Sequence, residues 1–207
     1  KQKMKQVNTF LSPLLGAYYF FYFALVGVYV IFMPKVLLDL GYSPMEVGIL
    51  YAAAPFMRFL LPFVFRHFLS LSPKVYHISL LFTFVGTLLF LATVHDFWIY
   101  LAANLLFGAA MGISLPYVET IALASLSRHI YGKVRLWGSL GFMGIALWLG
   151  KVLESPYEAL YYLSVVAFLT LIFGAMLTRY DTISHSTAQE DASFSLTRYW
   201  AFWISIF

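Results

Sequence analysis

The chain of 207 residues is 62% hydrophobic and 11% charged. Soluble domains are about 45–50% apolar, so this composition excludes an ordinary soluble protein. Cysteine is absent, which excludes disulfides and thiolate metal sites. The formal net charge of +4 is carried largely between apolar runs, and we do not interpret it as a sign of nucleic-acid binding.

Apolar runs of about 20 residues can cross a bilayer as helices, and the first such run covers roughly residues 10–36. A turn follows at residues 39–42. The segment Ser43-Pro44-Met45-Glu46 then predicts a helix start, because Ser caps a helix, Pro suits its first position and Glu completes a capping box. The second span extends to about residue 65.

Four further spans are predicted from the remaining apolar runs. His95-Asp96 separates the third span from the fourth, and a basic loop at residues 128–133 separates the fourth from the fifth, which opens with Arg135. The expected third to sixth spans are residues 75–94, 97–126, 135–150 and 159–177. The predicted fold class is therefore all-α: a polytopic membrane protein with a six-helix bundle over residues 1–178.

The sequence changes character after this bundle. Residues 179–197 are polar and predict a cytoplasmic linker, and residues 198–207 predict the start of a seventh transmembrane helix. The chain begins with Lys1 and stops inside an apolar run, so we expect a piece of a longer protein whose C-terminal half is missing. Six spans, a linker and a seventh span are the pattern expected of the first half of a duplicated transporter.

Basic residues are distributed unequally between the two sides of the predicted bundle. The side of the N-terminus and the linker collects Lys1, Lys3, Lys5, Arg66, Lys74, Arg128, Lys133, Arg179 and Arg198. The other side has Lys35 and Lys151 among several acids. Because cytoplasmic loops carry an excess of Lys and Arg, we expect a multi-pass protein of the inner membrane with a cytoplasmic N-terminus.

The segment from Tyr131 to Gly141, with the sequence YGKVRLWGSLG, resembles the start of the fifth helix in proton-coupled symporters of the major facilitator superfamily. The resemblance is to the branch of the phenylpropionic acid permeases, which is similar to lactose permease and to nucleoside symporters. Residues 16–72 look like the same branch, including the turn at residues 41–44 and the segment at residues 57–60.

This resemblance implies a substrate site. In lactose permease a glutamate late in helix four and an arginine early in helix five hold the sugar, and Glu119 and Arg135 match those positions. Phe142 stands where lactose permease has a tryptophan that stacks on the sugar. The resemblance also implies a proton as coupling ion and a C-terminal six-helix half of the same polypeptide as partner.

Glu119 and Arg135 also stand out without the resemblance. A charge inside hydrocarbon costs at least about 2.5–3.5 kcal/mol, and such residues usually face a cavity, a partner or a substrate. On a helix hairpin the two could pair, and a substrate carboxylate could compete for the guanidinium, which favours bidentate carboxylates. The alternative is an interfacial arginine and a protonated glutamate. Arg58 lies too deep to reach the surface, so we expect a substrate contact or a structural anchor.

Tyr22 and Asn104 complete the predicted substrate-binding set. Tyr22 and Tyr29 lie seven residues apart on the first helix, where they could line a cavity or simply pack. Asn104 could face the cavity or form an interhelical hydrogen bond. The five histidines lie in or near loops, so we predict no metal ion and no cofactor, and the glycines at 138, 141 and 144 predict close helix packing.

The expected function is secondary active transport by alternating access, with proton-coupled symport of a small organic acid, aromatic acids included. Arg58 and Arg135 outnumber Glu119, which favours an anionic substrate. The alternatives are a sugar or nucleoside proton symporter, and a non-transporting membrane sensor or scaffold with the same fold. No paired aspartates, histidine-rich site or Ser/Lys dyad at membrane depth supports an intramembrane enzyme.

Overall fold

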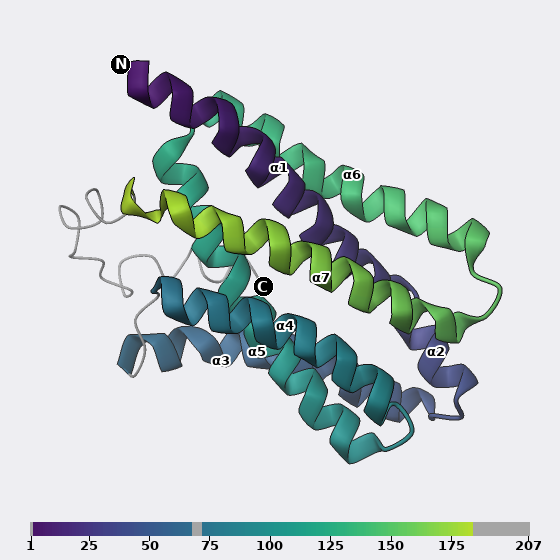
Figure 1. Cartoon of the computed structure of the whole chain (residues 1–207). Helices are drawn as coiled ribbons and strands as arrows, with labels where there is room; N and C mark the ends of the chain where they lie inside the picture. Colours follow the sequence, from purple (N-terminus) through teal and green to yellow (C-terminus); the bar gives the residue numbers. More distant parts are fainter. Residues whose placement is uncertain (1, 68–71, 184–207) are drawn as a thin grey trace, which may run out of the picture.

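The computed structural model describes residues 2–67 and 72–183, and side chains over residues 10–61, 63 and 72–180. Within these residues the chain is helical and contains no strand. Figure 1 shows long helices that lie side by side and run between two ends of the molecule. In chain order they are α1 (Gln2–Ile31), α2 (Met33–Asp39), α3 (Pro44–His67), α4 (Pro73–Thr93), α5 (Phe97–Ser125), α6 (Arg128–Val152), the short turn η1 (Pro156–Glu158), α7 (Ala159–Leu177) and η2 (Thr178–Ile183).

The first predicted span consists of two helices, because α1 is interrupted at Phe32 before α2 continues to Asp39. Pro34 explains the interruption, since proline has no N–H to donate to the preceding turn and its ring disfavours an unbroken helix. The apolar run itself extends over Phe10–Asp39, three residues beyond the predicted end.

Side-chain caps fix several helix starts, and the one at Ser43 is predicted from sequence. The backbone N–H and hydroxyl of Ser43 both donate to Glu46 Oε2 at 2.8 Å, and the Glu46 N–H donates back to the Ser43 hydroxyl, which confirms the capping box. Ser72 accepts from the Val75 N–H at the start of α4, and Asp96 accepts from the Ile99 N–H at the start of α5.

The start of α6 differs from the prediction. The segment at residues 128–133, expected as a loop, forms the first turns of α6, and Arg135 lies seven residues inside the helix. Hydropathy marks where a chain leaves the hydrocarbon, whereas a helix can continue into the polar interface as long as its backbone bonds are made. The link between α5 and α6 is therefore only two residues long.

The helices form two groups that do not follow chain order. α1 packs along α6 and α7, whereas α5 packs along α3 and α4, and α4 joins the groups by packing on α7. α5 and α6, although consecutive, touch only slightly. Aromatic rings fill much of the interior, and the largest fully buried side chains include Tyr18, Tyr19, Tyr76, Tyr100, Phe90 and Phe107.

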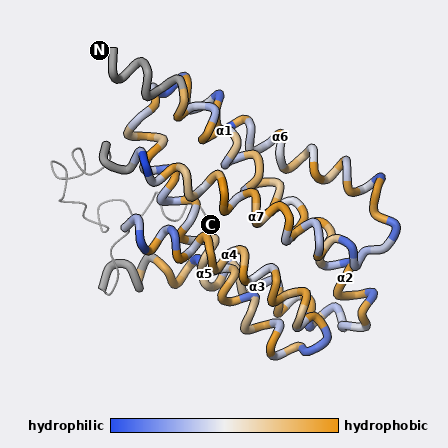
Figure 2. The backbone as a smooth tube through the Cα atoms, in the orientation of Figure 1, coloured by the Kyte–Doolittle hydropathy of each residue, from blue (hydrophilic) through white to orange (hydrophobic). Residues whose placement is uncertain are grey.

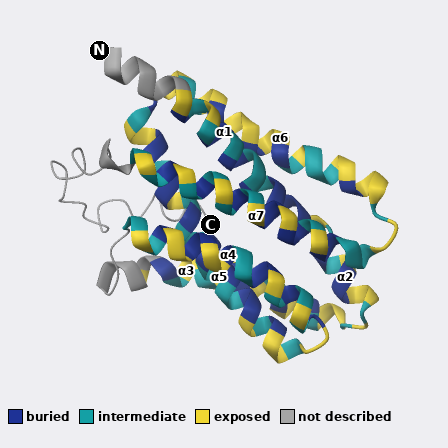
Figure 3. Cartoon of the chain, in the orientation of Figure 1, coloured by how far each residue is buried: buried dark blue, intermediate teal, exposed yellow. Residues whose placement is uncertain are grey.

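The outer faces of the helices are apolar as well, as expected of a multi-pass membrane protein. Large apolar side chains are exposed along several helices, where Figure 3 shows exposed positions on the outer faces. They include Phe59, Leu81, Leu140, Leu147 and Val165. Five stretches of the described residues are long and apolar enough to cross a membrane. α6 is not among these stretches, because its polar first turns and its glycines lower its mean hydropathy. It nevertheless lies along α1 and brings the long helices of the described residues to six.

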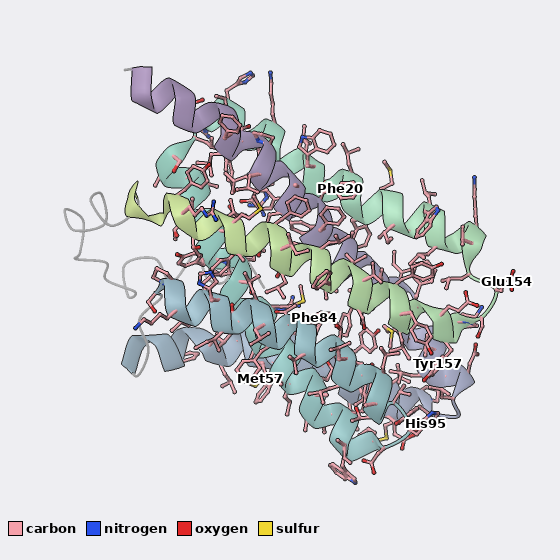
Figure 4. All side chains as sticks on the ribbon, viewed as in Figure 1. Phe20, Met57, Phe84, His95, Glu154 and Tyr157 are labelled. Atoms are coloured by element: carbon pink, nitrogen blue, oxygen red, sulfur yellow. The ribbon has the colours of Figure 1, made fainter. Side chains whose placement is uncertain are left out.

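The two ends of the bundle differ in charge, as predicted. Figure 2 shows polar residues gathered at the ends of the helices. The end that holds the N-terminus carries Lys74, Arg128, Lys133 and Arg179. Figure 4 places His95, Glu154 and Tyr157 at the opposite end.

Two sequence predictions fall largely beyond these helices. Of the predicted linker at residues 179–197, the structure describes the part up to Ile183, which belongs to η2. The predicted seventh helix at residues 198–207 lies outside the described residues.

Candidate functional site

Glu119, Tyr131 and Arg135 form a connected polar cluster between α5 and α6. Arg135 Nη1 donates to Glu119 Oε1 at 2.7 Å and to the Tyr131 hydroxyl at 2.7 Å. The Tyr131 hydroxyl in turn donates to Glu119 Oε2 at 2.5 Å. The Glu119 side chain is 17% exposed and that of Arg135 is 49% exposed, so the carboxylate is mostly enclosed while the guanidinium remains open.

The short link between α5 and α6 brings these residues to one depth. Glu119 precedes the end of α5 at Ser125 by six residues, and Arg135 follows the start of α6 at Arg128 by seven. At 1.5 Å per residue both lie roughly 10 Å from the helix ends. The ion pair considered from sequence is thus formed.

An open pocket of about 360 Å³ adjoins this cluster. Arg135, Ser139 and Phe142 of α6 line it together with Phe23 of α1. The three α6 residues are spaced by four and three, so they lie on one face of the helix. The pocket therefore presents one guanidinium, one hydroxyl and two aromatic rings.

Two glycines set the distance between α6 and α1 and thereby position this face. A Cβ added at Gly141 would lie 2.1 Å from the Phe20 carbonyl oxygen, and one at Gly138 would lie 2.5 Å from the Phe23 ring. Both contacts are far closer than any real Cβ allows, so α6 rests directly on α1 at these positions. Among the described residues nothing lies within 4 Å of a Cβ placed at Gly144, so two of the three glycines predicted for helix packing serve it there.

Arg58 is exposed on α3 and lies over α5. Its Cγ would be 3.1 Å from a Cβ at Gly112, so the glycine leaves room for the arginine stem. Gly112 precedes Glu119 by seven residues, which puts Arg58 about 10 Å further along α5. Among the described residues no carboxylate lies within ion-pair distance of Arg58.

Comparison with known proteins gives this site a family. The sequence matches the model of the MFS_1 like family over residues 14–199. The chain belongs to this family. The family is part of the major facilitator superfamily that the α6 segment resembles, and the six-helix bundle fits the N-terminal half of that fold.

Two proteins to which this MFS_1 like chain is similar are described as transporters. A protein of Escherichia coli (strain K12) described as "Probable 3-phenylpropionic acid transporter" is 28% identical over 174 residues, which cover 77% of this chain and 42% of the relative. The crystal structure of the nucleoside transporter NupG has a similar fold, with a TM-score of 0.69 and 22% identity over 91% of this chain and 48% of that one. The chain thus spans less than half the length of either relative.

Tyr22 and Asn104, the remaining predicted site residues of this family member, are buried. The Tyr22 hydroxyl donates to the Met111 carbonyl at 3.1 Å. The Tyr29 hydroxyl donates to Asn104 Oδ1 at 2.7 Å, which is the interhelical hydrogen bond considered from sequence. Asn104 Nδ2 has no partner among the described residues. These groups hold α1 on α5 and do not line the pocket beside Arg135.

Sequence reasoning missed Tyr131, Ser139 and Phe23. The sequence predicts a loop at Tyr131, whereas the structure places it one helical turn before Arg135, where residues four apart are neighbours. Phe23 and Ser139 carry no charge and no motif, so only the packing of α6 on α1 reveals them. In the described part of the chain no group of three His, Asp or Glu residues is arranged to hold a metal ion.

Proposed function

We propose that this chain forms the N-terminal half of a secondary active transporter that binds a small organic acid at Arg135 and carries it by alternating access. The observation that carries the proposal is the half-exposed guanidinium of Arg135, paired with Glu119 and open to a pocket with two aromatic rings. Membership of the MFS_1 like family and the described activity of the 3-phenylpropionic acid relative support it. We infer no enzymatic activity.

Binding would proceed by exchange of carboxylates. In the structure Glu119 neutralises Arg135, and Tyr131 holds both groups. A substrate carboxylate entering the pocket takes the open side of the guanidinium, which favours planar bidentate partners. The rings of Phe23 and Phe142 provide apolar contact for the rest of the substrate. With Arg58 included, the charged residues described at membrane depth carry a net positive charge, which favours an anionic substrate.

Proton coupling and membrane orientation are further parts of the proposal. Once the substrate occupies Arg135, Glu119 loses its cationic partner and becomes able to take up a proton, so substrate and proton would travel together. The resemblance to proton symporters supports this step. The basic end of the bundle would face the cytoplasm of a cell with the protein in its inner membrane, by the positive-inside rule.

Uptake by the full-length protein in proteoliposomes tests the function. We expect accumulation of labelled 3-phenylpropionate that grows with an inward proton gradient. Uptake of lactose or uridine instead of the acid would show that the substrate is a sugar or a nucleoside. Folded protein that takes up none of these across a broad panel would overturn transport and favour a sensor or scaffold.

Replacing Arg135 by Lys tests the binding residue. Lysine keeps the charge but lacks the fork that binds both carboxylate oxygens. A charge-assisted hydrogen bond contributes about 1.5–3 kcal/mol, so we expect uptake at low substrate concentration to fall roughly tenfold or more. Arg128→Lys is the matched control, because Arg128 is exposed at the start of the same helix, and it should leave uptake unchanged. Uptake by Arg135→Lys within twofold of the parent would refute the role.

A further inference from the structure

A second hollow lies on the other side of the contact between α1 and α6. It is an open groove of about 550 Å³ lined by Ser12, Pro13, Gly16, Ala17 and Phe20 of α1 and by Trp137 of α6. Figure 4 labels Phe20 in this region. Phe21, which also lines the groove, stacks on Phe173 of α7 with ring centroids 5.2 Å apart. The groove therefore follows α1 between α6 and α7.

The groove is separate from the pocket beside Arg135. Gly138 and Gly141 rest on α1 and form the seam between the two helices. Arg135, Ser139 and Phe142 lie on the pocket side of this seam, whereas Trp137 lines the groove and no residue is shared between the two hollows. An occupant of the groove is thus not the solute bound at Arg135.

The walls of the groove are suited to a hydrocarbon chain. Small residues form its floor, since a Cβ at Gly16 would lie 3.1 Å from Trp137 Cδ1, and the indole forms one wall. Trp137 is 53% exposed, so the described helices leave this wall of the groove uncovered. Ser12, at the end nearer the N-terminus, supplies a hydroxyl. Tryptophan is enriched where apolar and polar regions of the membrane meet.

The end of the groove near Ser12 is basic. Lys133 is exposed on α6 and precedes Trp137 by four residues, which puts it on the same face one turn closer to the end of the bundle. The exposed charged residues described at this end, Lys74, Arg128, Lys133 and Arg179, are all basic. Glu119, the acid described at this depth, is bound to Arg135 on the other side of the seam. A negatively charged headgroup fits this end by charge.

We propose that this groove binds one anionic phospholipid, with an acyl chain between α6 and α7 over the small residues of α1 and the phosphate at Lys133. The apolar groove ends beside a basic group. A phospholipid carries its acyl chain and its charged headgroup in the same order. Basic sites between transmembrane helices bind acidic lipid headgroups in this way. The inference is independent of which solute the protein carries.

Bromine-labelled lipids measure the proposed contact, because bromine quenches tryptophan fluorescence at short range. The full-length protein, with its tryptophans other than Trp137 changed to Phe, is placed in vesicles of phosphatidylcholine with 20% phosphatidylglycerol. Bromine is carried either by the phosphatidylglycerol or by an equal amount of phosphatidylcholine. We expect about fivefold more effective quenching by the brominated phosphatidylglycerol.

Matched variants separate the headgroup from the chain. Lys133→Gln should remove the preference for the acidic lipid, whereas Lys151→Gln, at the opposite end of the same helix, should preserve it. Ala17→Leu fills the floor of the groove and should reduce quenching by both lipids, whereas Ala124→Leu on the exposed face of α5 should not. Native mass spectrometry of the parent protein and of Lys133→Gln, with phosphatidylglycerol added, gives a second readout that needs no tryptophan changes.

Equal quenching by the two brominated lipids would overturn the proposal. So would the same lipid preference in Lys133→Gln and Lys151→Gln, or retention of bound phosphatidylglycerol by Lys133→Gln in the mass spectrometer. Absence of quenching by either lipid would show that protein covers the groove, and that result also overturns it.

Discussion

Tyr131 is the residue that joins the two charges of the site. Its hydroxyl accepts from Arg135 and donates to Glu119, so a single phenol uses both of its hydrogen-bonding roles inside one ion pair. A guanidinium that is half exposed has many available rotamers, and a fixed acceptor restricts them. We therefore regard Tyr131 as a positioning residue for Arg135.

Tyr131→Phe tests this role at the scale of one hydroxyl. The ring stays and the two hydrogen bonds are lost. For a partly exposed site we expect this loss to weaken substrate binding by about 1 kcal/mol. We expect the KM of uptake to rise roughly fivefold while the maximal rate changes less than twofold. Tyr161→Phe, an exposed tyrosine on α7, is the control. A maximal rate that falls as much as KM rises would contradict a role in positioning alone.

At the scale of elements, the packing of α6 on α1 decides where the pocket and the groove lie. The two hollows occupy opposite sides of a seam whose closest approach is at Gly141. Any side chain there meets the backbone of Phe20, which cannot rotate away. The stability of the folded protein therefore depends on the absence of a Cβ methyl group at residue 141.

Gly141→Ala and Gly144→Ala give opposite results on this argument. Overpacking costs about 1–3 kcal/mol, so Gly141→Ala should lower the melting temperature of the purified full-length protein by several degrees. No described residue crowds Gly144, and alanine favours a helix by about 1 kcal/mol over glycine, so Gly144→Ala should leave the melting temperature equal or higher. Equal melting temperatures of the two variants would show that α1 and α6 can move apart to accept a methyl group at residue 141.

The helices could be predicted from the sequence to within a few residues where apolar runs and caps coincide. α5 and α7 begin and end close to the expected residues, and the capping box at Ser43 is formed. The start of α6 could not be predicted, since polar residues continued the helix beyond the hydrocarbon. The pairing of α1 with α6 could not be predicted either, because helices that are apolar on most faces do not show by periodicity which face meets which partner.

The candidate site was predictable in its charges and not in its surroundings. Glu119 and Arg135 stood out because charges at membrane depth are rare. Tyr131, Ser139 and Phe23 needed the three-dimensional contacts. The substrate roles of all six residues proposed from sequence remain predictions, and the burial of Tyr22 and Asn104 assigns them to helix packing in the described structure.

On the scale of the whole molecule, the two ends of the bundle predict its orientation. The chain contains no cysteine, so single cysteines can be introduced here without background from this half. In a full-length protein with no other cysteine, we expect His95→Cys to react with a membrane-impermeant maleimide in intact cells. Ser127→Cys, at the opposite end, should react only after the membrane is permeabilised. The reverse pattern would invert the proposed topology.

The division of the helices into two groups has a consequence for biosynthesis. α1 is made before its packing partners, since α6 begins 97 residues and α7 begins 128 residues after α1 ends. At about 5–20 residues per second, α1 waits roughly 5–20 s before α6 exists. During that time the hydroxyls of Tyr18 and Tyr19, which are enclosed in the described bundle, face lipid or the insertion machinery. α1 thus reaches its final packing only after its later partners are made, and we expect it to remain beside the insertion machinery until they arrive.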